Sequence, residues 1–455
     1  MRAHDIQMEI YKEISLKQAI GQLRAVPVNL GQGQPKAFLL IYAEDAEIDP
    51  YVRMFFFPTG TNKLMLITAD GDVVWQRNMG PGAIPGIWFF PVFPFDMDGD
   101  GIDEIYLINN RDPAHPLNHY QYCLERIDGQ TGETMGQLQL PDQPPQDISR
   151  IFRYFILGGF VDHTPVLVTG QGTYGPMMLQ GWNFDMTVRW QASIDGDKGT
   201  KGSHMCAVVD LANSGVDGVL WGERYIEFDR GQELWCADGE SYSGHSDIVQ
   251  PILDWDTNRW YIHTCRESGE APRIVCFDHQ GQRLWGDLAE GHIDTGWAAH
   301  LGENGEPIVL GVRIAQKQRS SAGERRTGIE EFTYRPFTGE RIDLGFSVYT
   351  TIPVDLNGDG IHELVKGYFE GDGTVLDRSG RVLGNTAGLS AMASKFIDHP
   401  GEQILSYAND GTVRIWVDRN AHDTDAAQRR YEHPFYRINQ RLTACGYNLF
   451  NLGGI

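Results

Sequence analysis

Four residues with metal-binding side chains lie in the middle of the chain. His245 and Asp247 stand in the run Tyr242-Ser-Gly-His245-Ser-Asp247, with His204 before them and Glu267 after them. Imidazole nitrogens and carboxylate oxygens are common ligands of divalent cations. If the fold brings the four together, they could hold a divalent cation against a substrate that bears a carboxylate.

The spacing of these residues predicts where they lie in repeated β units. His204 stands six residues before Asp210, so we expect it on the innermost strand of one unit, with His245 and Asp247 in the corresponding stretch of the next. Period-two alternation then directs the side chains of this pair to one side of their strand. Glu267 is expected to end the second strand of that unit. The alternative for either histidine is a buried core residue without a ligand.

Two acidic loops present oxygens at alternate positions around glycine-containing turns. Such spacing is typical of calcium loops, and the alternative is a turn closed by its own side-chain hydrogen bonds without metal. The ligand candidates are Asp96, Asp98, Asp100 and Glu104 in the first loop, and Asp355, Asn357, Asp359 and Glu363 in the second.

Two recurring phrases indicate the elements that position these residues. One is a hairpin of the form aromatic-Asp, a short spacer and Gly-x-x-Leu-Trp, as in Phe228–Trp235 and Phe277–Trp285. The other is an apolar strand that runs into an acidic turn and a second strand, as in Phe93–Glu104. Together they give four strands per unit, the pattern of β-propeller blades.

We therefore predict an all-β fold, a β-propeller with eight blades. The units open near residues 22, 88, 150, 202, 245, 291, 348 and 388, and seven blades with a closing strand would fit almost as well. The predicted domains are an N-terminal segment, 1–21, the propeller, 22–420, and a closing or capping segment, 421–455. The stretch from Asp5 to Ala25 has a helix-like composition.

Composition limits the classes of partner. The 53 glycines and 11 tryptophans among 455 residues fit a glycine-punctuated β protein. A formal net charge of −23 argues against nucleic acid and against anionic membranes. An acidic oligosaccharide or polysaccharide fits only if a bound metal or arginines such as Arg224, Arg266 and Arg313 offset the charge. Oligomeric state cannot be predicted.

The expected location is the cytoplasm. The first residues lack a basic region followed by an apolar one, no apolar run could span a bilayer, and the six cysteines show no close pairing.

The run Gly244-His245-Ser-Asp247, followed by Cys265-Arg-Glu267 and preceded by His204, resembles the metal site of family 11 polysaccharide lyases. These rhamnogalacturonan lyases are eight-bladed propellers with many acidic calcium loops. The ulvan and rhamnose-glucuronate lyases are a more distant match.

The resemblance implies a site and a reaction. His204, His245, Asp247 and Glu267 would hold a Ca²⁺ that also binds a uronate carboxylate. Neutralising that charge would acidify the proton α to the carboxylate and permit β-elimination. The alternatives are a glycoside hydrolase on the same scaffold and a propeller that only binds a sugar or a protein.

The chain departs from the family at the catalytic positions. Trp297 stands where the family has an arginine, and the family's lysine falls near Ser347, where the chain has no lysine. Another base is therefore required, and the candidates are His292, Arg266 and Tyr174. Sugar contacts are expected from Arg224, Tyr242, Trp297 and His119, although packing between blades would equally explain Tyr242 and Trp297.

Overall fold

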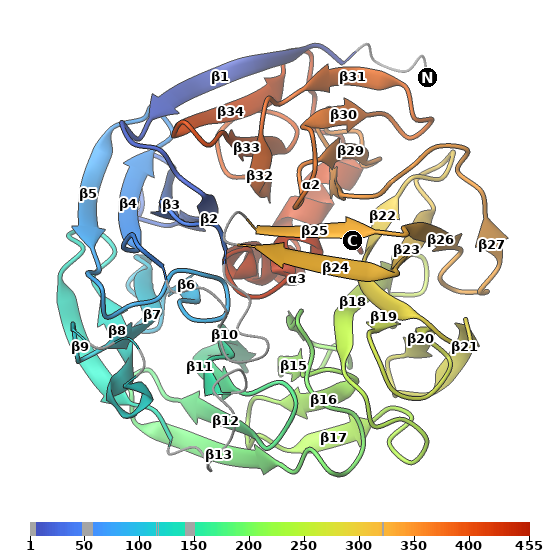
Figure 1. Cartoon of the computed structure of the whole chain (residues 1–455), viewed down its shortest axis with the longest axis horizontal. Coiled ribbons are helices and arrows are strands. Elements are labelled where there is room, and N and C mark those ends of the chain that lie inside the picture. The colour runs from blue at the N-terminus through green and yellow to red at the C-terminus, as the bar shows by residue number, and fades with distance from the viewer. Residues whose placement is uncertain (1–5, 48–57, 115, 117, 142–150, 321–322) are drawn as a thin grey trace.

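The computed structural model describes residues 6–47, 58–114, 116, 118–141, 151–320 and 323–455, and within them eight four-stranded sheets surround a common centre (Figure 1). This is the predicted eight-bladed propeller, and the seven-bladed alternative is wrong. Each first strand begins at or shortly after its predicted opening.

The strands of each blade are given from the centre outward. The first four blades comprise β2 (Gln22–Val28), β3 (Ala37–Ala43), β4 (Lys63–Thr68) and β5 (Val73–Asn78); β6 (Val92–Phe95), β7 (Glu104–Asn110), β8 (Tyr122–Ile127) and β9 (Thr134–Gln139); β10 (Tyr154–Val161), β11 (Thr164–Gln171), β12 (Met177–Trp182) and β13 (Val188–Ile194); and β14 (Ala207–Val209), β15 (Gly218–Leu220), β16 (Arg224–Glu227) and β17 (Glu233–Cys236). The last four comprise β18 (Ser246–Asp254), β19 (Arg259–Arg266), β20 (Ile274–Asp278) and β21 (Arg283–Asp287); β22 (His292–His300), β23 (Pro307–Ile314), β26 (Glu330–Tyr334) and β27 (Arg341–Ile342); β28 (Thr351–Val354), β29 (Glu363–Lys366), β30 (Thr374–Leu376) and β31 (Val382–Asn385); and β32 (Leu389–Ser394), β33 (Gln403–Tyr407), β34 (Thr412–Asp418) and β1 (Met8–Ser15).

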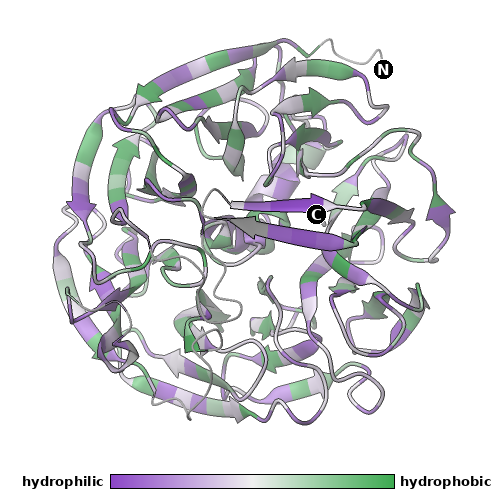
Figure 2. Cartoon of the chain, viewed as in Figure 1, coloured by the Kyte–Doolittle hydropathy of each residue, from purple (hydrophilic) through white to green (hydrophobic). Residues whose placement is uncertain are grey.

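Burial falls from the centre of each blade to its rim. The inner strands β18 and β22 are almost wholly buried, because neighbouring blades cover both of their faces. Most residues of the outer strands β5 and β9 are exposed or half-buried, and Figure 2 shows both green and purple segments along these strands. The core therefore lies between the inner strands, and these strands fix the residues at the centre.

The N-terminal strand closes the ring. Met8–Ser15 pair antiparallel with Thr412–Asp418 as the outermost strand of the last blade. The helix-like composition of this stretch was a misleading guide, because the free edge of β34 supplies hydrogen-bond partners that local propensity does not anticipate.

The C-terminal tail caps the centre and is not the closing strand. It forms α2 (Asp425–Glu432), α3 (Pro434–Asn439) and the 3₁₀ turns η2 (Gln440–Leu442) and η3 (Asn448–Phe450), and the helices lie at the centre of the ring in Figure 1. The turn η2 contacts β2 and β6, and η3 contacts β22, β28 and β32. None of the described helices has the length and apolar character needed to cross a membrane.

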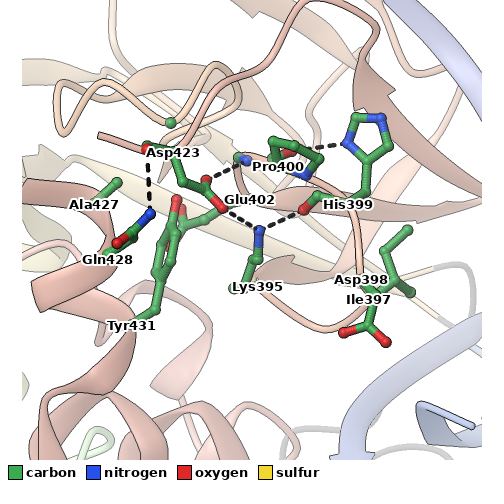
Figure 3. Close-up of polar contacts among 12 residues, drawn as sticks. Lys395, Ile397, Asp398, His399, Pro400, Glu402, Asp423, Ala427, Gln428 and Tyr431 are labelled. Atoms are coloured by element: carbon green, nitrogen blue, oxygen red, sulfur yellow. Dashed lines mark hydrogen bonds and ion pairs between the residues drawn. The ribbon is translucent and has the colours of Figure 1, made fainter. Parts of the chain in front are cut away.

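A partly buried ion pair ties this cap to the last blade (Figure 3). The Lys395 ammonium lies 2.8 Å from Asp423 Oδ2, donates to the carbonyl of His399, and lies 5.2 Å from the centroid of the Tyr431 ring. Asp423 also accepts a hydrogen bond of 2.7 Å from the backbone N–H of Gly401. The start of α2 is therefore held against the loop that follows β32.

The recurring Gly and Trp positions join successive blades. Trp235 Nε1 donates to the carbonyl of His279 at 3.2 Å, and a methyl group at Gly281 would lie 2.8 Å from the Trp235 ring. Gly281 also has a φ of +77°, which side chains rarely adopt. Glycine at this position therefore avoids both a clash with the Trp235 ring and a strained backbone. The same pairing occurs between Trp75 and Gly132, Trp190 and Gly231, and Trp285 and Gly339.

A hairpin interrupts the sixth blade between β23 and β26. Its strands are β24 (Gln316–Ser320) and β25 (Gly323–Thr327), which pair only with each other among the described residues. The hairpin lies across the centre of the ring in Figure 1 and is largely hydrophilic in Figure 2. It therefore brings polar residues over the inner strands, whereas the blade continues beneath it.

Candidate active site

The carboxylates of Asp247 and Asp294 enter the centre of the ring from two equivalent irregularities. The pairing of β18 with β19 shifts between Ser246 and Ile248, and that of β22 with β23 shifts between Ile293 and Thr295. In each case the extra residue is the aspartate. A bulge redirects a side chain that regular alternation would place elsewhere, so two adjacent blades present a carboxylate at the same point.

The structure brings His204, His245 and Asp247 together. His204 Nδ1 lies 3.2 Å and His245 Nε2 lies 3.6 Å from Asp247 Oδ1. His204 precedes β14 and does not lie within it, and it is positioned by a hydrogen bond from its N–H to the carbonyl of Ser246. The neighbouring blade therefore places both histidines.

Apart from their contacts with one another and with Glu267, the buried ligand atoms of these three residues have no hydrogen-bond partner among the described residues. These atoms are His204 Nδ1, His245 Nε2 and both carboxylate oxygens of Asp247. Burying an unsatisfied polar atom is costly, and burying an unsatisfied carboxylate more so. The ligand atoms of the three residues lie within 4.8 Å of one another, a spacing that fits a metal ion. The donor set therefore suits a divalent cation.

Glu267 and His292 extend this group toward Asp294. Glu267 follows β19 directly and pairs with His245 through one carboxylate oxygen, whereas its other oxygen lies 2.8 Å from His292 Nε2. His292 Nε2 also lies 3.1 Å from Asp294 Oδ1. Asp247, Glu267, His292 and Asp294 form a second group of metal-ligating types that shares Asp247 with the first.

The hairpin supplies two cations to this acidic group. Lys317 on β24 pairs with Asp294 Oδ1 and lies 3.6 Å from Glu267 Oε1. Arg326 on β25 lies 2.5 Å from Asp294 Oδ2 and 4.0 Å from the centroid of the Phe369 ring. Both hairpin cations thus pair directly with Asp294, whereas among the described residues they act on Asp247 only through their charge.

These contacts shift the acid–base properties of the buried groups. Burial, and then the charges of Glu267 and Asp294, raise the pKa of Asp247 well above its usual range. Burial also disfavours the charged form of Asp294, but the Arg326 charge and the His292 hydrogen bond hold the pKa of that carboxyl below its usual range. Burial, aided by the Arg153 charge, lowers the pKa of His204. A neutral His204 is the form that can donate a lone pair to a metal.

The ligands face a polar cavity of about 390 Å³, here called the histidine cavity. Its lining includes Arg153, Tyr174, His204, His292 and Lys317. Tyr174 Oη lies 3.3 Å from His204 Nε2, and the Arg153 guanidinium lies 5.2 Å from the centroid of the Tyr174 ring. Groups able to move protons therefore adjoin the candidate cation site.

Comparison by sequence matches the chain to two curated rhamnogalacturonan lyases. No family model matches the chain. A rhamnogalacturonan exolyase of Bacillus subtilis, YesX, is 23% identical over 349 residues, or 67% of this chain and 53% of the relative. The rhamnogalacturonan endolyase YesW of the same organism is 22% identical over 270 residues, or 51% of this chain and 42% of the relative.

The solved structures agree. YesX has a TM-score of 0.76 at 19% identity, covering 96% of this chain and 80% of that one. A rhamnogalacturonan lyase of Bacillus licheniformis, of family PL11, has a TM-score of 0.73 at 18% identity, covering 97% and 81%. The chain resembles family 11 rhamnogalacturonan lyases in sequence and fold. It spans about half the length of the curated relatives that it matches.

Two residues expected to act in this lyase-like centre are instead buried supports. Arg266, predicted as catalytic, donates to Glu223 at 2.9 and 2.6 Å and to Asp238 at 2.8 Å, and lines neither the histidine cavity nor the other described cavities. Tyr242 lies against the Arg266 guanidinium, 3.8 Å away, and donates to the carbonyl of His245 at 2.7 Å. The pair therefore holds His245 in place from behind.

Two further residues expected to contact sugar, Arg224 and Trp297, are also buried, whereas the prediction for His119 is not tested. Arg224 is buried and donates to the carbonyl of Thr200 and to Glu233, so it supports the fourth blade. Trp297 is buried in the core and donates to Thr351, as packing between blades would require. His119 begins the 3₁₀ turn η1 (His119–Gln121), but its side chain lies outside the described part of the chain.

The two acidic loops differ. Asp96, Asp98 and Asp100 bring their oxygens within 4.8 Å of one another, whereas Glu104 pairs with Arg126. Asp355 accepts hydrogen bonds from Gly358, Asp359 and Gly360 and lies 3.6 Å from Arg430, so a buried arginine stands beside it. Asn357 donates to Asp359, and Glu363 accepts from Leu356. Among the described residues, the acidic groups of the second loop form no such cluster.

Sequence reasoning missed Asp294, Lys317, Arg326 and Arg153. One signal was available for Asp294, because His292-Ile-Asp294 repeats the spacing of His245-Ser-Asp247 one blade later. The lysine absent near Ser347 has a counterpart in Lys317, which arrives on an inserted hairpin. No local pattern in the hairpin predicts which blade it will contact.

Proposed function

We propose that the chain cleaves a uronate-containing glycan of the rhamnogalacturonan type by β-elimination, with Ca²⁺ held by His204, His245, Asp247 and Glu267. The observation that carries this proposal is the cluster of ligand atoms on His204, His245 and Asp247, beside a cavity that both histidines line. Similarity to rhamnogalacturonan lyases supports the choice of reaction.

The cation would neutralise the uronate carboxylate and acidify the proton on C5. The protein's own residues bind and orient the sugar around it. Lys317 and Arg153 line the cavity and place two positive charges near an acidic substrate. Asp294 fixes the position of Lys317 through their ion pair.

Tyr174 and His292 are the groups assigned to proton transfer. Tyr174, as a phenolate stabilised by the neighbouring Arg153 charge, accepts the C5 proton, and a C4–C5 double bond forms as the C4–oxygen bond breaks. His292, as an imidazolium, donates its proton to the departing glycosidic oxygen. His292 is partly exposed at 36% of its side chain and so lies within reach of a bound glycan.

The test is product analysis with rhamnogalacturonan, ulvan and rhamnose-glucuronate oligosaccharides in the presence of Ca²⁺. Elimination yields products that absorb in the ultraviolet and contain no added water, whereas hydrolysis adds one water. His245→Ala should abolish the absorbance, and His422→Ala, an exposed histidine outside the cavity, should not. Products with added water would replace the proposal with a hydrolase, and no product from any substrate would refute it.

A further inference from the structure

A second cavity of about 220 Å³ adjoins the histidine cavity and is here called the aromatic cavity. Trp88 and Tyr447 line it, and each also contacts His204, with ring centroids 4.9 and 5.2 Å from the imidazole. The hairpin spans both spaces, since Lys317 lines the first and Glu324 lines the second. The two cavities are therefore neighbours on the same side of the ring.

Several buried polar atoms in the lining of the aromatic cavity have no hydrogen-bond partner among the residues that the structure describes. They are Nε and Nη2 of Arg24, the hydroxyl of Tyr368 and the hydroxyl of Ser390. Arg24 and Ser390 are only 6% and 5% exposed. Arg24 is held through Nη1, which donates to the carbonyls of Phe90 at 3.1 Å and Ala444 at 2.7 Å. Its orientation is thus set while its other edge stays available.

Five aromatic residues also line the cavity. Trp88, Tyr368, Phe369, Tyr407 and Tyr447 all border the cavity. Rings supply flat apolar surfaces for the C–H faces of a sugar, and fixed donors beside them satisfy its hydroxyl oxygens. An apolar ligand would leave the Arg24, Tyr368 and Ser390 donors unsatisfied.

Charge decides between a neutral and an acidic ligand. Glu47 lines the same cavity, and its charge acts on Arg24. The two charges offset each other, so a second carboxylate would gain little from Arg24 and would be repelled by Glu47. Glu47 can also accept a hydrogen bond from a hydroxyl, which a neutral sugar supplies.

We propose that the aromatic cavity binds a neutral pyranose residue through Arg24, Tyr368 and Ser390. If the proposed function holds, this residue belongs to the same glycan as the uronate in the histidine cavity. Binding in the aromatic cavity itself requires no metal, because none of its donors belongs to the His204, His245 and Asp247 group.

Ligand-detected NMR with methyl α-L-rhamnopyranoside, methyl β-D-galactopyranoside and methyl α-D-glucopyranoside tests this inference on the full chain in EDTA. Tyr368→Phe removes only the unpartnered hydroxyl and should weaken binding of the preferred pyranoside about threefold to tenfold, as expected for one lost hydrogen bond. Arg24→Lys, which keeps the charge but loses the planar donor edge, should weaken it as well. Tyr261 lines neither cavity, so the control variant Tyr261→Phe should bind the pyranoside as the wild type does.

Each outcome bears on the proposal. The proposal is supported if saturation is transferred to a pyranoside and if Tyr368→Phe and Arg24→Lys both reduce that transfer. This holds even if the protein releases no unsaturated product. Binding that His245→Ala abolishes and Tyr368→Phe leaves unchanged would place the sugar at the histidines and overturn it. Absence of transfer to all three pyranosides at millimolar concentration would also overturn it, whereas elimination activity could still be observed separately.

Discussion

Arg326 Nη2 lies 2.5 Å from Asp294 Oδ2, joining the inserted hairpin to the inner strand of its own blade. Both side chains are almost fully buried, and Lys317 contacts the other oxygen of the same carboxylate. Asp294 therefore serves to anchor the hairpin. In the preceding blade, no lysine or arginine among the described residues forms an ion pair with Asp247, the residue at the equivalent irregularity.

Removing the Lys317 charge should greatly reduce turnover and leave the stability of the fold largely unchanged. Lys317→Met is expected to lower kcat/KM for an acidic glycan by at least about 100-fold, the usual scale for loss of a group that acts on the reacting centre. Arg325→Met is the control, because Arg325 is an exposed neighbour on the same hairpin. Equal activity of the two variants would remove Lys317 from the mechanism.

Calcium should stabilise the protein through the histidines. At a concentration 100 times Kd, a ligand that binds only the folded state adds about 2.7 kcal/mol. We expect Ca²⁺ to raise the Tm of the wild type and of His422→Ala, but not that of His204→Ala or His245→Ala, in scanning calorimetry after EDTA treatment. A shift that survives in both cavity variants would assign the calcium to another site, such as the Asp96 loop.

The contact between blades at Gly281 can be measured against a matched glycine. Gly281 and Gly345 have nearly the same φ, +77° and +76°, but only at Gly281 would a methyl group meet a neighbour, the Trp235 ring at 2.8 Å. Both alanine variants carry the backbone cost of about 1 kcal/mol, and Gly281→Ala should lose about 1–3 kcal/mol more from overpacking. Urea unfolding gives the difference, and equal losses would mean that the tryptophan contact is not constraining.

Asp217 should make the protein less stable as pH rises. Burial raises the pKa of this carboxyl to about 6, above its unfolded value of about 4. The native state therefore favours the protonated form, and the stability that this gives below pH 4 is lost as pH rises through 6. Asp217→Asn should be more stable than the wild type at pH 7, by up to about 3 kcal/mol for two pKa units. The two unfolding curves should coincide near pH 4; a constant difference would contradict the assignment.

The repeat predicted the fold well because each blade is a local unit. Strands, acidic turns and the Gly and Trp positions recur within one stretch of chain, and their spacing alone determines which strands are neighbours. The helix-like composition before Ala25 failed because β1 pairs with β34, whose edge lies at the other end of the sequence.

The site was predicted in part for the same reason. His245 and Asp247 lie at the start of β18 and Glu267 directly follows β19, so their proximity follows from the pairing of these consecutive strands. Arg266 and Tyr242 were mistaken for site residues because sequence alone cannot tell a buried support from a group facing the cavity. Lys317 and Arg326 were missed because contact between an insertion and the centre of the ring depends on tertiary packing.

The pairing of β1 with β34 also governs the order of assembly. The ribosome makes Met8–Ser15 long before the strand that they pair with, which is complete only when Asp418 has been made. For most of synthesis β1 has no partner. The last blade then keeps an open edge at β34 until β1 pairs with it. Such distant pairing slows folding and leaves an edge able to join another chain. Refolding at high protein concentration should therefore yield exchanged dimers in which β1 of one molecule completes the last blade of another.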